Sequence, residues 1–508
     1  MIEGKSLNNK ENKCIICDRL IGQFGDIEKD KCILHCEKDD WYIEDENGKR
    51  NWNKSELKIK KFWDEIRQHE EKFCTEVQFS RIVFPDLFRE DMFPDIDFKK
   101  SFFSNFKESM KKKIVFRNCI FLNNIEYFVS NFEFSDCKFS QSVSFYCDYI
   151  YSKSLALKNC SRFHGECKIV NIIQGTVVKE KVVNININKC VFKFDVKIEN
   201  LWISKLSIDN TSFEQSLTLN DCLIEEIDIK NKDKKMINKI VFENNEFCKK
   251  SDIYFENVDI GFLSFKKNLN DSEFMSFFNI NISQGLEFIN SNLSNFEFHN
   301  CNFSKAKIKI ENVAFISNNG FTIFNDVKWP SCKEFSYIIV KDEEDNKILS
   351  LRDTFRQLKY VNEKQGNIID ANKFYSAEMK EYKKELKNEK WRTYWQDKII
   401  FWLNEKVSNF SQNWILPLIW FFSIGAVAFY ISNIDRAKHY IISSFDLTRF
   451  PIIIMPPIKK VLEEYISFIN PFSISSENTN SMIWLVFKAL SVFIIYQFII
   501  SLRRQTRR

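Results

Sequence analysis

The middle of the chain alternates apolar and polar residues in a short pattern that returns many times. From about Ile114 to Phe315 the pattern reads apolar, any, apolar, two residues, a small residue or Cys, any, apolar. Clear copies are Phe132, Phe134, Cys137, Phe139 and Leu217, Leu219, Cys222, Ile224. A period of two predicts short β-strands. Copies that begin about 10 to 13 residues apart predict coils that stack on one another and bury a shared ladder of Phe side chains.

Two residue types recur inside this pattern. An Asn or Asp usually precedes the small position, and such residues tolerate the tight backbone geometry of a corner. Examples are Asn118, Asp136, Asn210, Asp221, Asn257, Asn290 and Asn300. Cysteines occupy the small position at Cys119, Cys137, Cys160, Cys190, Cys222 and Cys301. Because Cys behaves there as a compact hydrophobe, we expect these thiols to pack inward and not to serve in catalysis or metal binding.

Each copy splits into two consecutive five-residue units, in which a small or medium apolar residue is followed two positions later by a large one. This pattern resembles the pentapeptide-repeat family. The resemblance implies a mainly β fold, a right-handed quadrilateral β-helix with the large residue stacked inside, which we expect over residues 81–335. Wider gaps between copies, Phe163 to Asn184 and Ile229 to Met236, are expected to be loops and are candidate recognition surfaces.

The N-terminal segment, residues 1–40, has the spacing of a small metal site. Cys14-x-x-Cys17 is followed by Cys32-x-x-His35-Cys36, which places two ligand pairs about fifteen residues apart. We interpret this as a structural zinc site with ligands Cys14, Cys17, Cys32 and Cys36. His35 is the alternative fourth ligand, and we favour Cys36 because thiolate is the softer donor. The competing interpretation is a cysteine-rich tail without metal.

Helical patterns flank the solenoid on both sides. Residues 41–80 form a connector with a helical pattern from Glu56 to Phe73. Residues 350–410 form a neck with two expected helices, Leu351 to Tyr360 and Ile369 to Leu403, broken at Gln365, Gly366 and Asn367. The neck resembles that of membrane-bound pentapeptide-repeat proteins with an ion-channel-like C-terminus, on Phe355, Leu358, Gly366, Asp370, Phe374, Tyr375 and Glu378. The same residues also suit a helical hairpin that caps the solenoid.

Residues 411–508 are expected to form a two-span transmembrane domain. Trp414 to Ile434 carries no charge and Met482 to Leu502 carries only Lys488, so each is long and apolar enough to cross a bilayer. Lys488 either reaches the interface or turns toward a bundle interior. The apolar segment Phe450 to Ile458, between the spans, is either re-entrant or lies on the membrane surface.

Basic residues before the first span and Arg503, Arg504, Arg507 and Arg508 after the second predict an inner-membrane, multi-pass protein with its N-terminal solenoid and C-terminus in the cytoplasm. Basic residues also lie between the spans, among them Arg436 and Lys459, which weakens this orientation without reversing it. The polar start of the chain does not resemble a signal peptide. We therefore expect the 15 cysteines to sit in a reducing compartment as thiols or metal ligands.

Composition narrows the classes of function. The chain has 52 Phe against 11 Gly and 8 Pro, so it is rich in large rings that must stack. With 74 basic and 69 acidic residues the net charge is +5, which indicates neither nucleic-acid binding nor an acidic DNA mimic. No catalytic triad, phosphate loop or paired carboxylates stand out, so we expect no enzyme.

The leading hypothesis is an oligomeric membrane effector or ion-channel-like protein, gated through its cytosolic solenoid by an unknown protein partner or ligand. Two helices cannot enclose a pore alone, so this hypothesis requires a homo-oligomer. The family resemblance implies a bacterial setting with a role in stress or phage defence. The alternative is a passive membrane-tethered scaffold that binds a protein partner through the solenoid.

Overall fold

The computed structural model describes residues 13–18, 25, 30–44, 46, 50–70, 76–85, 113–122, 125–129, 131–147, 154–160, 162–171, 183–233, 235–270, 274–317, 320–336, 351–388, 391–432, 458–472 and 481–506. The chain divides into two compact units, Met1–Ile348 and Leu349–Arg508. The first unit holds the strands and one helix, and the second is helical.

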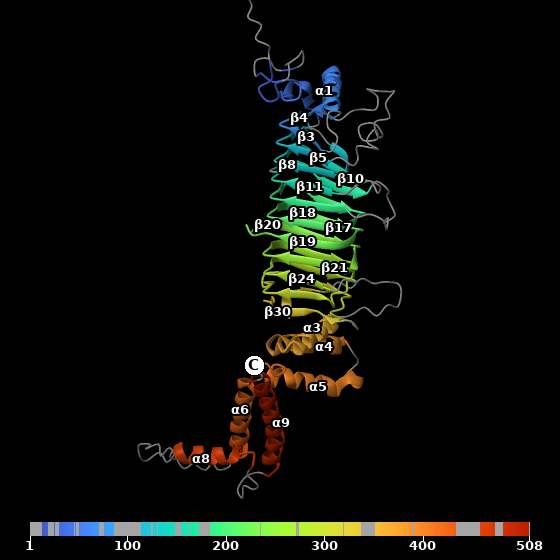
Figure 1. Ribbon diagram of the computed structural model, residues 1–508. Coiled ribbons are helices and arrows are strands. Elements are labelled where there is room, and N and C mark those ends of the chain that lie inside the picture. Colours follow the sequence, from blue (N-terminus) through green and yellow to red (C-terminus); the bar gives the residue numbers. More distant parts are fainter. Residues whose placement is uncertain are drawn as a thin grey trace, which may run out of the picture. The chain divides into compact units, whose positions relative to one another are not determined.

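The first unit is a parallel β-solenoid whose coils follow one another from β3 to β30 (Figure 1). One side is a 12-stranded sheet. Its strands are β3 (Glu76–Ser80), β5 (Lys113–Arg117), β8 (Asn131–Ser135), β11 (Ser154–Lys158), β14 (Val183–Asn188), β17 (Trp202–Asp209), β19 (Leu223–Lys230), β21 (Glu246–Glu256), β23 (Leu269–Asn270), β24 (Phe274–Phe278), β26 (Phe296–His299) and β30 (Ile323–Asn325). The predicted solenoid is confirmed, and its first strand begins at Glu76, before the predicted boundary at residue 81.

The other side is a 15-stranded sheet. Its strands are β4 (Val83–Phe84), β6 (Ile120–Phe121), β7 (Ile125–Val129), β9 (Lys138–Phe139), β10 (Val143–Cys147), β12 (Arg162–Phe163), β13 (Cys167–Asn171), β15 (Val191–Phe192), β16 (Val196–Glu199), β18 (Ser212–Asn220), β20 (Met236–Glu243), β22 (Asp259–Lys266), β25 (Asn281–Ile289), β27 (Lys307–Glu311) and β31 (Phe335–Ser336). Two small antiparallel pairs lie outside these sheets, β1 (Ile43–Glu44) with β2 (Arg50–Asn51), and β28 (Ile316–Ser317) with β29 (Gly320–Phe321).

The strand register corrects the expected stacking of the copies. Leu206 of β17 pairs with Ile227 of β19, 227 − 206 = 21 residues later, and Leu217 of β18 pairs with Ile240 of β20, 240 − 217 = 23 residues later. Copies 10 to 13 residues apart therefore do not stack on each other. Consecutive copies alternate between the two sheets, so one coil takes two copies.

The interior is a ladder of stacked rings, as the sequence predicts. On the 15-stranded sheet the ring centroids of Phe121, Phe139, Phe163, Phe192 and Phe213 follow one another at 4.9, 4.5, 4.3 and 5.1 Å. These steps match the spacing of ~4.8 Å between hydrogen-bonded strands, so pairing the backbones also stacks the rings. Each ring is fully buried, which contributes roughly 1.5–3 kcal/mol of transfer free energy apiece.

The corners take the left-handed backbone conformation. All seven Asn and Asp residues predicted at corners have positive φ, from 46° at Asn290 to 57° at Asp136 and Asn257. L-residues seldom adopt this conformation, and Asn and Asp tolerate it best after Gly. Lys189 and Lys267 occupy equivalent corners with φ of 53° and 52°. The stacked coils impose the geometry even on residue types that do not favour it.

The predicted inward cysteines are confirmed, and the predicted loops need correction. The six cysteines are buried, and their thiols donate to backbone carbonyls of the preceding coil, as from Cys137 Sγ to Phe116 O at 3.4 Å. The gap after Phe163 is not one loop, because β13 lies within it and only residues 172–182 fall outside the described residues. The gap after Ile229 is a short turn, in which Asn231 is buried.

Helix α1 (Glu56–Glu70) covers the N-terminal end of the solenoid (Figure 1). Its buried residues Ile59, Phe62, Trp63 and Ile66 share one face. The rings of Phe62 and Trp63 lie 5.7 and 6.1 Å from that of Phe84 in β4. A helix at this end shields the apolar interior of the first coil, as terminal caps of solenoids generally do.

The second unit consists of α3 (Leu351–Lys364), α4 (Ile368–Asn388), α5 (Trp391–Ser408), α6 (Ile415–Ser432), α8 (Ile458–Ile469) and α9 (Ser481–Thr506). The predicted break after α3 is confirmed, with Gly366 at φ 77°. The expected single helix from Ile369 to Leu403 is wrong, because α4 ends at Asn388 and α5 begins at Trp391. Helix α5 is itself kinked at Tyr394, whose φ of −119° and ψ of 22° are not helical.

Candidate metal centre and membrane helices

Two short turns in the N-terminal segment bring the predicted ligands together. Within the first, Asp18 N donates to Cys14 O at 2.9 Å, and within the second, His35 N donates to Cys32 O at 2.9 Å. Ile15 N donates to Asp30 O at 2.9 Å and joins the two turns. The segment has few apolar residues of its own, so these bonds and the side chains between the turns define its local structure.

The ligand atoms of Cys14, Cys17, Cys32 and His35 all lie within 4.8 Å of one another. Cys32 Sγ is 3.2 Å from His35 Nδ1, Cys14 Sγ is 3.6 Å from the same nitrogen, and Cys17 Sγ is 3.6 Å from Cys32 Sγ. A tetrahedron with metal–sulfur bonds of ~2.3 Å and a metal–nitrogen bond of ~2.0 Å has edges of roughly 3.5–3.8 Å. The donor set fits that geometry, and the cluster can hold a metal ion.

The structure groups His35, not the favoured Cys36, with the three other predicted ligands. The Cys36 thiol lies 3.6 Å from Ile33 O instead, because its position one residue beyond His35 carries it to the other side of the turn. His35 Nε2 lies 3.2 Å from Ser80 O in β3. If Nε2 donates to that carbonyl, Nδ1 presents its lone pair to the cluster, the arrangement usual for metal-bound histidines.

The thiols of the cluster have different proton affinities. Burial raises the pKa of Cys14, but backbone N–H donors of Cys32, Ile16 and Cys17 outweigh it, so the net pKa is lowered. Burial raises the pKa of Cys32 to about 12, and the neighbouring Cys17 and Cys14 add to the rise. A cation at the centre favours all the thiolates at once, so metal binding and deprotonation are coupled here.

A buried lysine lies beside the cluster. Lys38 is fully buried, donates from Nζ to Cys36 O at 3.1 Å, and places its ammonium 5.1 Å from the ring centroids of both Trp41 and Phe62. Burial lowers its pKa to about 8, against the attraction of Cys36, Cys32 and Asp40. The sequence gave no signal for this residue, because its burial depends on the packing of α1 against the N-terminal segment.

Two helices of the second unit are long and apolar enough to cross a membrane. They are Ile415–Ser432, which is α6, and Met482–Arg504 within α9, and they agree with the two predicted spans. Only 17% and 22% of their residues are buried inside the protein. A core helix of a soluble protein would be mostly buried, so the exposed apolar faces favour association with a membrane.

Helices α6, α8 and α9 share a small apolar core made of Ala428, Phe468, Ile469 and Phe487. Gly425 permits the close approach of α8, since a Cβ there would lie 2.8 Å from Ile469 Cγ2. Lys488 donates to Asn470 O just beyond α8, which corresponds to the predicted reach toward a polar end of the span. The segment predicted as re-entrant, Phe450 to Ile458, lies outside the described residues except for Ile458, the first residue of α8.

The other end of the spans contains a polar network that the sequence did not reveal. Gln497 of α9 accepts from Ser408 Oγ at 3.0 Å and donates to Asn404 Oδ1 at 2.9 Å. Trp420 Nε1 donates to Lys406 O at 2.9 Å. These bonds fix α5 at the end of the spans that carries Arg503 and Arg504. The polar Gln497 inside an apolar run was the available signal.

Comparisons of the chain with models of protein families, with curated proteins and with solved structures found no match.

Proposed function

We propose that this protein is a membrane effector, in which a cytosolic solenoid receives a protein partner or ligand and a two-span domain assembles with other copies into an ion-channel-like structure. The single observation that carries the proposal is the exposure of the spans. Ile419, Phe422 and Val427 of α6 are 55%, 50% and 58% exposed, and the same is true of residues throughout α9. Lipid and neighbouring copies are the surroundings that suit such faces.

The orientation proposed places both units outside the bilayer core on the cytoplasmic side. Arg503 and Arg504 lie at the end of α9 next to α5, which is rich in basic residues, and positive charge favours the cytoplasmic leaflet. The resemblance to membrane-bound pentapeptide-repeat proteins supports a bacterial inner membrane, multi-pass insertion, and a role in stress or phage defence.

We assign the metal in the N-terminal cluster as structural zinc, held by Cys14, Cys17, Cys32 and His35. Three thiols and one imidazole are a donor set that zinc prefers, and all four positions are taken by protein atoms, which is typical of structural and not catalytic sites. The zinc would hold the two turns against β3 through His35 and Ser80. It would therefore stabilise the solenoid end that α1 covers.

The test is ion flux through liposomes that contain the purified full-length protein, with the mass of the protein–detergent complex measured in parallel. The expected result is conductance from a defined oligomer, and loss of conductance when residues 450–458 are deleted. Cell extract is added in a second series to supply a missing trigger. Tight liposomes in both series, together with a monomer in detergent, would contradict the channel.

A passive membrane-tethered scaffold is the second candidate, and one observation favours it. The core shared by α6, α8 and α9 is filled by Phe468, Phe487 and their apolar neighbours, as suits an anchor. An anchor predicts that an unrelated two-span segment can replace residues 411–508 without loss of function. A channel predicts that this replacement abolishes it.

A further inference from the structure

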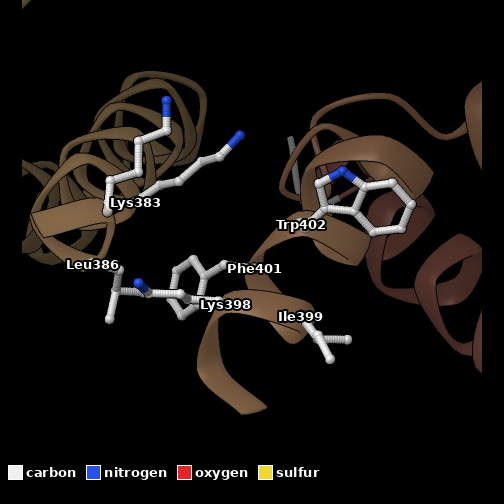
Figure 2. Close-up of a pocket in the computed structure, with 7 residues that line it drawn as sticks. Lys383, Leu386, Lys398, Ile399, Phe401 and Trp402 are labelled. Atoms are coloured by element: carbon white, nitrogen blue, oxygen red, sulfur yellow. The ribbon is translucent and has the colours of Figure 1, made fainter. Parts of the chain in front are cut away.

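A cavity of about 300 Å³ lies between α4 and α5, outside every site described above. It is lined by Lys383, Leu386, Lys387, Lys398, Ile399, Phe401 and Trp402. Figure 2 shows Lys383 across the cavity from Trp402, and Leu386 beside Phe401. The volume is at the lower end of the range for small-molecule sites, about 300–1,000 Å³.

The cavity has an apolar floor and a cationic rim. Leu386 is buried at 3% exposure, and Phe401 packs edge-on against Tyr382 at a centroid distance of 4.8 Å. Three of the seven lining residues are lysines and none is acidic. Lys383 forms an ion pair with Glu405, so the lysines and that carboxylate together leave two positive charges at the rim.

The position of α5 indicates where such a ligand would come from. The bonds of Gln497 to Ser408 and Asn404 hold α5 at the basic end of the spans, where the surface of a bilayer is expected. Trp395 and Ile400 are 47% and 51% exposed, and Trp402 is 53% exposed. Exposed Trp and Ile beside Lys are typical of helices that lie in the interface of an anionic membrane.

We propose that this cavity is a binding site for an anionic phospholipid, with the phosphate at Lys387 and Lys398 and the start of an acyl chain along Ile399 and Trp402. The inference rests on the membrane insertion in the proposed function. It adds that the neck recognises the lipid at its own bilayer surface, so that lipid composition would influence how α4 and α5 are held together.

The experiment is a titration of the full-length protein in neutral detergent with phosphatidylglycerol or phosphatidylcholine, with bound lipid counted by native mass spectrometry. Wild-type protein is expected to bind phosphatidylglycerol at least tenfold more tightly than phosphatidylcholine. The double variant Lys387→Gln/Lys398→Gln is expected to lose that preference, since a lysine near an anionic surface typically changes affinity about fivefold. The control double variant Lys380→Gln/Lys406→Gln removes the same charge from α4 and α5 outside the cavity, and is expected to keep the preference.

Equal losses in the two double variants would overturn the site in favour of diffuse attraction. Displacement of phosphatidylglycerol by inorganic phosphate at the same concentration would show a phosphate site and overturn the lipid. Flotation of each variant with phosphatidylcholine vesicles separates this inference from the proposed function. Failure of wild-type protein to float contradicts membrane insertion, whereas flotation without lipid preference contradicts only the cavity.

Discussion

Replacing Phe298 with Ala tests the ring ladder at its most stacked point. Phe298 is 2% exposed, and its ring lies parallel to those of Phe277 at 4.8 Å and Phe324 at 5.5 Å, one coil to either side. Truncation removes the ring from both stacks and leaves a cavity that the adjacent coils cannot close, since their backbones are fixed by strand pairing.

We expect the substitution to cost about 3–5 kcal/mol, the usual range for a buried Phe→Ala change. The loss of two stacked ring pairs, at roughly 0.5–1.5 kcal/mol each, accounts for part of this cost. Phe298→Asp should cost more, because it also buries an unpaired charge. In a solenoid each coil contacts only its neighbours, so the effect should concentrate in β24, β26 and β30.

Hydrogen–deuterium exchange of the full-length protein in detergent measures this locally. Amides of β26 should exchange about 150- to 4,000-fold faster in Phe298→Ala, at about 1.4 kcal/mol per factor of ten, while β5 and β8 should be unchanged. Phe194→Ala is the matched control, because Phe194 is 41% exposed and should give less than about 0.5 kcal/mol. Similar exchange in the two variants would refute the register of the ladder.

Three further predictions concern other parts of the chain. Purified wild-type protein should contain one zinc per chain, His35→Ala should lose most of it and Cys36→Ala should keep it; elemental analysis showing the reverse would restore Cys36 as the fourth ligand. Asn244→Val should destabilise by about 1–2 kcal/mol because φ there is 53°, whereas Asn244→Gly should be near neutral in thermal unfolding. Burial lowers the pKa of Lys38 to about 8, so with metal chelated the folded state binds this proton more weakly than the unfolded state, and stability should rise between pH 8 and about 10.5. Lys38→Met should abolish that rise and stabilise the chelated protein at pH 7 by roughly 1–3 kcal/mol; an unchanged pH profile in calorimetry would contradict the buried charge.

The features predicted from sequence are those set by short-range patterns. The inward Cys and Phe positions and the corners at Asn118 and Asn300 follow from residue size and backbone preference within one coil. The alternation of copies between two sheets does not follow, because a single copy reads the same on either side of the solenoid. It requires the partner of Leu206, which lies a whole coil away at Ile227.

The errors at the candidate sites have the same origin. The choice between His35 and Cys36 depends on Ser80, which is 45 residues away and meets His35 Nε2 only after β3 has formed. The division between α4 and α5 has no Gly or Pro to announce it. It is held by contacts from later in the chain, such as that of Gln497 with Asn404.

The alternation of copies between the two sheets constrains how this solenoid can change length during evolution. Loss or gain of a single copy would move every later strand to the opposite side and reverse the face that each corner and charged side chain presents. Loss or gain of a pair, such as the 21 residues that separate Leu206 from Ile227, keeps all the faces and shifts the ends by one strand spacing, ~4.8 Å. Homologous solenoids should therefore differ in length by whole coils, and any surface that binds a partner should survive such a change as a shorter or longer copy of itself.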